Sequence, residues 1–410
     1  MDTAPILHWL LTEARMLADP GAMLDGLAQH FGALGYPMLR SNVQVRTQHP
    51  EVSMRLYAWR RTAVQVEQRP TQSVIGETFV ASATGVVQEI VLDHSAFLNL
   101  AYIQSPFQPV NAEGVTVRCR IAPDQTSFEY PLLRDLQAMG ATDYLCVPLE
   151  LAIGPRAAMS WATDRPGGFD DTFLQAVQTL RPALALCTEL HSARHITRSL
   201  LHAYVGADAG ERVLAGQFHR GDVRQIQAAV WFSDLRGFTT LSSQLSSAEL
   251  VATLNAYFGA LAPALAAHGG EVLKYIGDAI LAVFAVRADR DATQACSDAV
   301  AAAQAATVAL EQLNRGRQSA GLAALDHGIG LHFGAAEYGN IGAPGRVDFT
   351  VIGRDVNLAS RVEGLCGKLQ QRLLVTRDVA DRVGGVAWRS LGEFELKGIA
   401  GRHGVLGVVG

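Results

Sequence analysis

Two aspartates stand where their side chains can leave a protein core and hold metal ions. Asp234 ends the apolar run QAAVWFSD (227–234), and Asp278 follows Gly277 in EVLKYIGDAILAVF. Gly237 lies three residues after the first acid, in a stretch that can turn tightly around a phosphate. Divalent cations such as Mg²⁺ take hard oxygen ligands and bridge to substrate phosphates. If the two carboxylates converge, they suit a paired divalent-cation site for phosphate chemistry.

The apolar runs and turn residues around these acids predict an antiparallel sheet with helices packed on it. Residues 227–234 and 271–284 read as strands, and Gly277–Asp278 breaks the second run into a hairpin with the acid at its tip. Two helices, two strands and a final helix are also expected, over 246–270, 289–313, 327–342, 346–353 and 354–366. The resulting order, β-α-β-β-α-β, is typical of a ferredoxin-like core.

Four short motifs around these positions resemble those of one enzyme family. They are FSDLRGFT (232–239), KYIGDAI (274–280), VIGRDVNLASR (351–361) and FELKG (394–398). Together they resemble the catalytic domain of class III nucleotidyl cyclases over residues 226–405. The resemblance implies that Asp234 and Asp278, with the carbonyl of Leu235, hold two Mg²⁺ or Mn²⁺ ions per active site. One ion would activate the ribose 3′-hydroxyl for attack on the α-phosphate, and the other would hold the β- and γ-phosphates.

The same resemblance implies which residues bind the nucleotide. Backbone N–H groups of the loop Arg236–Thr240 would face the triphosphate, namely those of Gly237, Phe238 and Thr239. Asn357 would orient the ribose, and Arg361, four residues along the same helical face, would stabilise charge on the α-phosphate. Lys397 resembles the lysine that binds the terminal phosphates. Outside this motif context, each of these three side chains would be interpreted as solvated surface.

Two positions that face the purine edge in this family correspond to Lys274 and Thr350. Lysine donates a hydrogen bond, which suits adenine N1, and threonine can accept one from the N6 amine. Guanine would leave its N1–H and N2 donors unpaired, so ATP is the predicted substrate and a guanylate cyclase is the alternative. Thr350 replaces the aspartate of the mammalian membrane enzymes and resembles a bacterial subgroup that includes bicarbonate-responsive cyclases. Gly328 stands where some relatives carry an arginine directed toward the phosphates.

In this family the active site is shared between two protomers. One protomer gives the metal-binding aspartates, and the other gives the base-reading, ribose and phosphate residues. This chain contains both sets once, so a C2 homodimer with two equivalent sites is expected. The alternative is a catalytically silent module that senses a nucleotide or another ligand. The complete set of seven positions favours the enzyme.

Length and composition place these motifs in a larger protein. The 410 residues predict two domains, and a net charge of −5 without blocks of like charge argues against nucleic acid or an anionic membrane as partner. The five cysteines are scattered, which is typical of buried thiols in a reducing compartment. The N-terminus lacks the features of a signal peptide. Polar residues interrupt the Ala-rich stretches 256–267 and 299–310, so no membrane span and a cytoplasmic location are expected.

The N-terminal half predicts a second, regulatory domain. Residues 140–193 resemble the closing half of a GAF-type sensory domain, with two strands, a Gly-containing turn and a terminal helix. We therefore expect an α+β protein in three parts: a GAF-like α/β sensor over 1–190, a helical linker over 191–225 and the ferredoxin-like catalytic domain over 226–410. Another helix-and-sheet fold is the alternative for the first part. Elsewhere in it, helices are expected over 4–18, 21–34 and 131–140, and strands over 41–48, 52–59 and 86–92.

The terminal helix of this half carries an apolar seam with a/d spacing, made by Phe173, Val177, Leu180, Leu184 and Cys187. The seam predicts either a parallel coiled coil between the two domains or packing of the helix on its own domain. Pro182 is expected to interrupt this helix by kinking it near Gln178–Thr179.

The stimulus of the N-terminal domain stays open as a small molecule or a protein. Cys146 is interpreted as a core thiol, because it lies in a predicted strand. His49, Tyr57 and Trp59 could line a ligand pocket or pack in the core.

Overall fold

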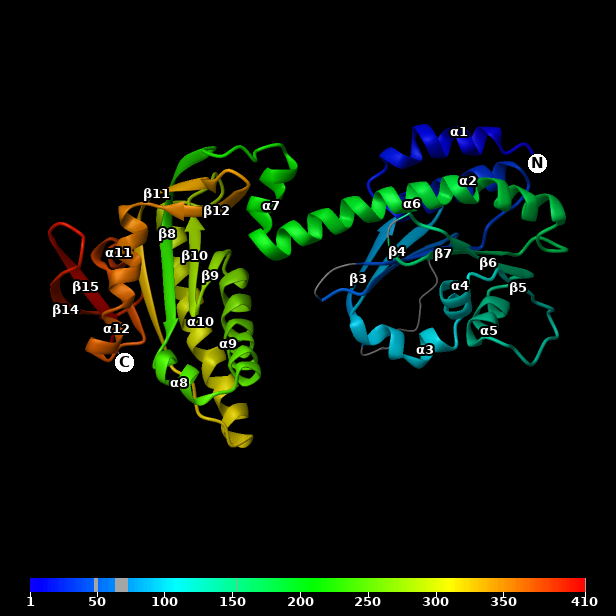
Figure 1. Cartoon of the computed structure of the whole chain (residues 1–410). Coiled ribbons are helices and arrows are strands. Elements are labelled where there is room, and N and C mark those ends of the chain that lie inside the picture. The colour runs from blue at the N-terminus through cyan, green and yellow to red at the C-terminus, as the bar shows by residue number, and fades with distance from the viewer. Residues whose placement is uncertain (48–50, 63–72, 153, 410) are drawn as a thin grey trace. The chain divides into compact units, whose positions relative to one another are not determined.

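The computed structural model describes residues 1–47, 51–62, 73–152 and 154–409. The chain divides into two compact units, Met1–Leu200 and Leu201–Gly410 (Figure 1). The long helix α6 (Asp171–Val205) begins in the first unit, and its last residues belong to the second.

The first unit is built on a seven-stranded antiparallel sheet in the order β3-β4-β2-β1-β7-β6-β5. The strands are β1 (Arg40–Arg46), β2 (Met54–Arg60), β3 (Val74–Ala81), β4 (Val86–Leu92), β5 (Val117–Arg120), β6 (Asp143–Leu149) and β7 (Ala157–Thr163). The α-helices before α6 are α1 (Ala4–Thr12), α2 (Pro20–Ala33), α3 (Leu100–Ile103), α4 (Phe107–Glu113) and α5 (Pro131–Ala138). Short 3₁₀ helices are η1 (Ala14–Met16) and η2 (His94–Leu98).

Helices pack on both faces of this sheet because successive strand side chains alternate between two cores. Leu10 of α1, Phe31 of α2 and Phe173 of α6 meet Trp161 of β7 in one core. On the other face, α4 and α5 pack against a cluster that contains Cys146. Figure 1 shows α1, α2 and α6 on one side of the sheet and α3, α4 and α5 on the other.

The predicted helices and strands of this half are largely confirmed, with three differences. The first helix ends at Thr12, earlier than expected, and η1 follows it. The strand β3, whose side chains are mostly exposed, was not predicted, and neither were β5, α3 and α4. Pro182 does not end the terminal helix, since α6 continues through it as one element of 35 residues, and the expected kink stays a prediction. Buried neighbours such as Leu180 and Leu184 hold the helix on the core on either side of the proline.

The second unit contains an eight-stranded sheet in the order β14-β15-β13-β11-β8-β10-β9, with β12 paired to β11. Its strands are β8 (Val223–Leu235), β9 (Glu271–Ile276), β10 (Ala279–Ala285), β11 (His327–Ala343), β12 (Arg346–Ile352), β13 (Leu373–Thr376), β14 (Trp388–Glu395) and β15 (Arg402–Val408). Its helices are α7 (Ala207–Leu214), α8 (Phe238–Gln244), α9 (Ser247–Ala267), α10 (Ala292–Ser319), α11 (Arg354–Glu363), α12 (Cys366–Leu369) and α13 (Arg377–Ala380).

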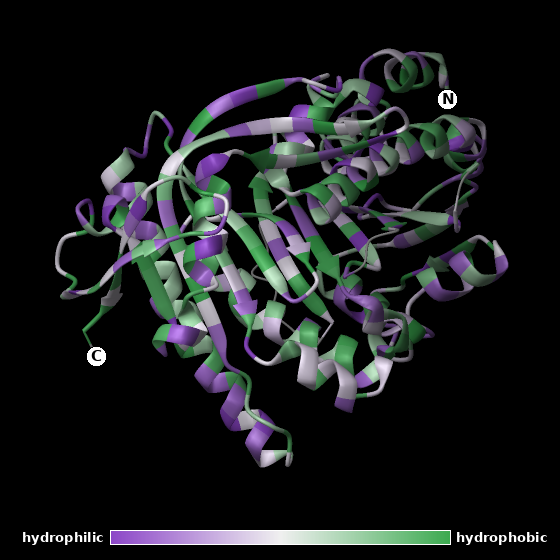
Figure 2. Ribbon diagram, turned by 60° about the vertical axis from the view of Figure 1, so that its left-hand side comes forward, coloured by the Kyte–Doolittle hydropathy of each residue, from purple (hydrophilic) through white to green (hydrophobic). Residues whose placement is uncertain are grey.

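Both faces of the second sheet are covered as well. Tyr257 of α9 and Val300 of α10 pack with Trp231 of β8 on one face. Val356 and Ala359 of α11 pack with a different set of β8 side chains on the other face. Figure 2 shows long hydrophobic stretches along the strands and polar residues on many of the helical turns.

The predicted order of elements in this half is confirmed as β8-α9-β9-β10-α10-β11. The expected cap of α9 is also present, because Ser246 and Glu249 form a reciprocal capping box. Two differences concern the start of the domain. The first strand begins at Val223, and the segment expected as a connector contains the helix α7, whose Asp208 accepts a hydrogen bond from Tyr338 Oη at 3.0 Å.

Four cysteines are buried, Cys119 is partly buried, and none of the five forms a disulfide, as expected for core thiols. Within the described residues, α9 is the one helix whose length and composition would allow it to cross a membrane. Its Tyr257, Leu261 and Leu265 are fully buried in the core of the second unit.

Candidate active site

The two aspartates singled out in the sequence meet at one end of the second sheet. Asp234 is the penultimate residue of β8, and Asp278 lies in the two-residue turn between β9 and β10. The turn needs a glycine before the acid, because Gly277 has a φ of +65°. The backbone N–H of Leu235 donates to Asp234 Oδ1 at 3.0 Å, and the carboxyl groups of Asp234 and Asp278 lie within hydrogen-bonding reach of each other.

This acid pair is electrostatically unfavourable without a cation. Burial, followed by the hydrogen bond and charge repulsion from Asp278, raises the pKa of Asp234 to about 7. Burial also raises the pKa of a third acid, Glu363 of α11, to about 7. Among the described residues, no three acidic, histidine or cysteine side chains are close enough to hold an ion alone. The pair therefore fits hard divalent cations that take their remaining oxygen ligands from substrate, water or backbone.

The raised pKa of Asp234 predicts how the stability of the metal-free chain depends on pH. Between the unfolded value of 3.8 and the folded value of about 7, the folded chain binds more protons than the unfolded chain. Its stability therefore falls as pH rises through this window. Asp234→Asn removes the penalty, so at pH 8 with chelator we expect the variant to melt roughly 2–4 °C above the wild type. At pH 4 the difference should vanish.

Scanning calorimetry with chelator at both pH values checks this expectation. The matched control is Asp289→Asn, since Asp289 is exposed between β10 and α10. A stabilisation by Asp234→Asn that is equal at the two pH values would contradict the assigned cause.

The segment after Asp234 differs from the predicted loop. Gly237, with a φ of +69°, precedes α8, so Phe238 and Thr239 lie in the first turn of a short helix. Phe238 packs against the core, and the Arg236 guanidinium donates to Asp326 Oδ2 at 2.9 Å. Arg236 is therefore a structural anchor. The first N–H groups of α8 lack partners within the helix and can still face a phosphate.

Helix α11 presents Asn357 and Arg361 together, as predicted. Its buried positions, which include Val356 and Val362, face the core, whereas Asn357 and Arg361 are exposed on the opposite side. Within the described part of the chain, neither of the two side chains makes a hydrogen bond or ion pair. They are therefore available to a ligand.

The start of α11 is fixed to β11 by Asp355. Its Oδ2 accepts a hydrogen bond from the N–H of Ala335 at 2.8 Å, and its Oδ1 lies 3.6 Å from His332 Nε2. The carboxylate fits because Gly334 has no side chain, since a Cβ there would lie 2.2 Å from Asp355 Oδ2. This contact sets the position of the helix that carries the predicted ribose and phosphate residues.

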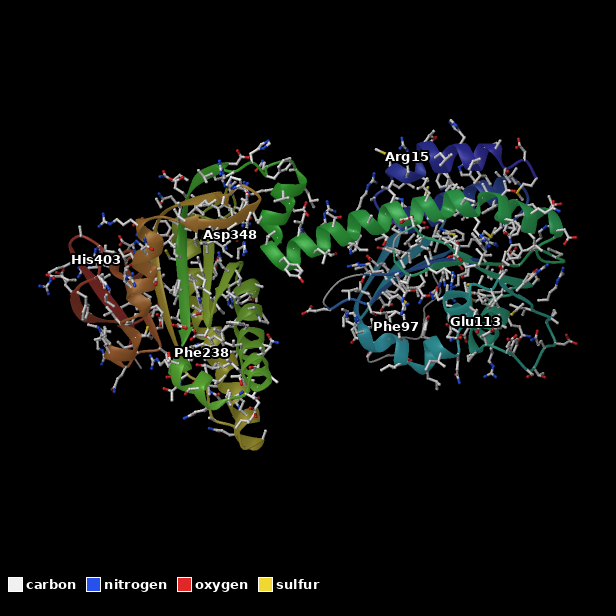
Figure 3. All side chains as sticks on the ribbon, in the orientation of Figure 1. Arg15, Phe97, Glu113, Phe238, Asp348 and His403 are labelled. Atoms are coloured by element: carbon white, nitrogen blue, oxygen red, sulfur yellow. The ribbon has the colours of Figure 1, made fainter. Side chains whose placement is uncertain are left out.

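The predicted base-reading residues lie on neighbouring elements. Lys274 is on β9 and Thr350 on β12, and the Lys274 ammonium forms an ion pair with Asp348 of β12. In Figure 3, Asp348 and Phe238 lie toward opposite ends of the second sheet. Phe238 marks the end with the acid pair, since it follows Asp234 by four residues. One protomer thus brings the acids together and the base-reading positions together, at different places on the sheet.

Two other positions from the sequence analysis differ in what they can contribute. Lys397 is exposed in the turn after β14 and is available to a ligand. Gly328 lies opposite Asp234 in the β8–β11 ladder, and a Cβ there would lie 2.6 Å from Glu363 Oε1. In this chain, Glu363 occupies the space that a side chain at position 328 would need.

Two charged residues at the site, Asp348 and Glu363, were not predicted from the sequence. Asp348 could have been found, because residues two apart on a strand share a face and Thr350 had been singled out. Glu363 gave no such signal, since its approach to Asp234 depends on how α11 packs across Gly328.

A separate candidate binding region is a cavity of about 470 Å³ in the first unit. It lies between α1, α2 and strands β2, β3 and β4, and its wall includes Trp9, Tyr57 and Asp25. Burial acts to raise the pKa of Asp25, but hydrogen bonds, including one from Trp59 Nε1 at 2.9 Å, lower it overall. Tyr57 thus lines a cavity and Trp59 supports its wall, whereas His49 lies outside the described residues.

Comparisons with known proteins give one family match and several similar proteins. Residues 223–408 match the family model described as "Adenylate and Guanylate cyclase catalytic domain". The chain is 37% identical over 154 residues to "Adenylate cyclase" of Anabaena cylindrica, which covers 37% of this chain and 29% of that protein. It is 27% identical over 288 residues to "Adenylate cyclase 1" of Rhizobium meliloti (strain 1021), which covers 68% of this chain and 43% of that protein. The chain thus spans less than half the length of these curated relatives.

Solved structures include a similar chain. The adenylyl cyclase CyaB from P. aeruginosa is 28% identical, with 46% of this chain and 96% of that chain covered and a TM-score of 0.43.

Proposed function

We propose that the protein is an adenylate cyclase, on the premise that residues 223–408 match the adenylate and guanylate cyclase catalytic domain. It would convert ATP to 3′,5′-cyclic AMP and pyrophosphate. The observation that carries the choice of ATP is the placement of Lys274, a hydrogen-bond donor, beside the strand of Thr350. The names of the similar proteins from Anabaena and Rhizobium support the same choice.

The acid pair would hold the divalent cations. Asp234 and Asp278 offer two part-buried carboxylates whose repulsion a cation would relieve. We propose two Mg²⁺ or Mn²⁺ ions per site, with the Leu235 carbonyl as a further ligand. When bound, these ions supply an acidified ribose 3′-hydroxyl and neutralise charge on the departing pyrophosphate.

The remaining residues would orient the nucleotide. Asn357 would position the ribose, so that its 3′-oxygen attacks the α-phosphorus as the bond to pyrophosphate breaks. The planar guanidinium of Arg361 would bond two oxygens of the crowded α-phosphate. Lys397 and the first-turn N–H groups of α8 (Phe238–Gln244) would hold the terminal phosphates.

We propose that a homodimer completes each site. In one protomer, Phe238 beside the acid pair and Asp348 beside the base-reading residues lie toward opposite ends of the sheet (Figure 3). Within the described residues, Arg361 forms no hydrogen bond or ion pair with Asp234 or with Asp278. A C2 partner that supplies Lys274, Thr350, Asn357, Arg361 and Lys397 would complete the site.

The first unit is proposed as a GAF-like regulatory domain in a cytoplasmic protein. Its cavity of about 470 Å³ falls within the range of roughly 300–1,000 Å³ that suits small organic ligands. A small molecule in this cavity, or a protein on its surface, would change the geometry of the catalytic dimer through α6 (Asp171–Val205).

The experiment that tests the enzyme is an assay of the purified full-length chain with ATP or GTP and with Mn²⁺ or Mg²⁺. Cyclic AMP formation with a higher kcat/KM for ATP is the expected result. Cyclic GMP as the main product would establish the guanylate cyclase alternative. Nucleotide binding without turnover would favour a catalytically silent sensing module.

The base-reading assignment predicts a shift of specificity in the double variant Lys274→Glu/Thr350→Cys. A glutamate at position 274 can accept from guanine N1–H and the N2 amine, while adenine N1 loses its donor. Each mispaired polar group costs roughly 1–3 kcal/mol, so the ratio of kcat/KM for ATP over GTP should fall about tenfold to a hundredfold per position. An unchanged ratio in a folded, active variant would show that selection occurs elsewhere.

A further inference from the structure

The ion pair between Lys274 and Asp348 joins two strands that share no backbone ladder. Among the described strands, β9 is hydrogen-bonded to β10 alone, and β12 is hydrogen-bonded to β11 alone. The side chains of Lys274 and Asp348 are 41% and 58% exposed, so neither is enclosed by the core. The side-chain contact therefore fixes Lys274 against the edge of β12.

We propose that Asp348 is a positioning residue for purine recognition, whose carboxylate holds the Lys274 ammonium beside Thr350 at the adenine edge. The inference deepens the proposed adenylate cyclase function and depends on it for the identity of the base. It adds a third residue to the two base-reading positions of the sequence analysis.

Strand alternation places Asp348 and Thr350 on one side of β12, and the ion pair with Asp348 brings the Lys274 ammonium to that side. Leu273 of β9 and Phe349 of β12 both point into the same core cluster, where the Phe349 ring meets Tyr338 at 4.8 Å. Neighbours on a strand point to opposite faces. Asp348 and Thr350, the residues flanking Phe349, therefore lie together on the reverse side of β12. The partly buried Phe349, packed against this cluster, keeps Asp348 and Thr350 in this orientation.

The chemistry of the pair explains why the position of Lys274 depends on Asp348. A lysine ammonium has three N–H donors on a flexible four-carbon stem, and an unpaired lysine samples many rotamers. A carboxylate that takes one donor leaves two for the ligand and restricts the stem. Adenine N1 accepts a hydrogen bond, so it gains from a donor held in place, whereas guanine N1–H does not.

Removing the carboxylate should weaken binding of ATP in the ground state and the transition state alike, because the adenine ring does not react. Such a loss raises KM and leaves kcat unchanged. For Asp348→Asn we expect KM for ATP to rise about threefold to tenfold, with kcat within about twofold of the wild type. Asp348→Glu, which restores the charge on a longer stem, should recover part of the loss.

The test measures kcat and KM for ATP and GTP in the full-length protein, together with equilibrium binding of a fluorescent ATP analogue. The variants are Asp348→Asn, Asp348→Glu and Lys274→Ala, and the double variant Lys274→Ala/Asp348→Asn. Asp289→Asn, at an exposed acid between β10 and α10, is the matched control. If Asp348 acts through Lys274, Asp348→Asn should change neither KM nor analogue affinity further in the Lys274→Ala background.

Two results would overturn the proposal. One is wild-type KM and analogue affinity in Asp348→Asn, which would make the pair a surface contact without function. The other is an equal loss with and without Lys274, which would point to a role that does not pass through the lysine.

The wild-type measurement separates this proposal from the proposed function. If the wild type binds the ATP analogue without turnover, adenylate cyclase activity fails while the binding measurements still decide the role of Asp348. If it neither binds nor converts ATP, both fail.

Discussion

Replacing either Asp234 or Asp278 by alanine is expected to abolish formation of cyclic AMP. The two carboxylates, which the structure brings into hydrogen-bonding reach at the end of the sheet, are the proposed hard oxygen ligands of the metal ions. Loss of one ligand removes several kcal/mol of charge stabilisation from the transition state, so kcat/KM should fall by about a thousandfold or more. The measurement is initial-rate formation of cyclic AMP by the purified variants.

The fold should survive both substitutions, which makes the loss interpretable. Both side chains lie at strand ends, where truncation opens no cavity in the core. Circular dichroism and the oligomeric state should therefore match the wild type, and Asp289→Asn should keep its activity. Substantial turnover by Asp234→Ala or Asp278→Ala would refute the metal assignment.

The acid pair and the order of elements could be predicted because the signals are local. Asp234 ends a strand and Gly277–Asp278 closes a tight turn, and both features depend on a few consecutive residues. Helix α9 was equally predictable, because Ser246 and Glu249 cap it within one turn. In each case the spacing of the apolar residues and the residue that ends the element indicate the same strand or helix. Long-range contacts were not needed to define the element.

Features that depend on tertiary packing could not be read from the sequence. The segment after Gly237 becomes the helix α8 because Phe238 finds a place on the core and Arg236 is held by Asp326. Pro182 does not end α6, since burial on both sides outweighs the lost hydrogen bond. Glu363 joins the acid pair only because α11 packs over Gly328.

The seven positions carried by the motifs were predicted, together with their division into an acid pair and a set of nucleotide-binding residues. The structure groups Asp234 with Asp278 and Lys274 with the strand of Thr350. It leaves Arg361 exposed without a partner among the described residues. The proposal that a second protomer completes the site can be tested by complementation.

Mixing Asp234→Ala protein with Arg361→Ala protein is expected to restore activity that neither variant has alone. In a heterodimer of the two, one site combines both defects, while the other receives an intact acid pair from one protomer and an intact Arg361 from its partner. Random exchange at equal concentrations makes about half of the dimers heterodimers, each with one working site, so activity should reach about a quarter of the wild-type value per protomer.

Mixing Asp234→Ala with Asp278→Ala is the matched control and should restore nothing, because both defects fall on the same half of the site and no protomer offers an intact pair. Subunit exchange should be confirmed with differently tagged chains. If exchanged Asp234→Ala/Arg361→Ala mixtures remain inactive, or if the control pair recovers equally, the shared site is wrong for this protein. Each protomer would then have to bring α11 to its own acid pair.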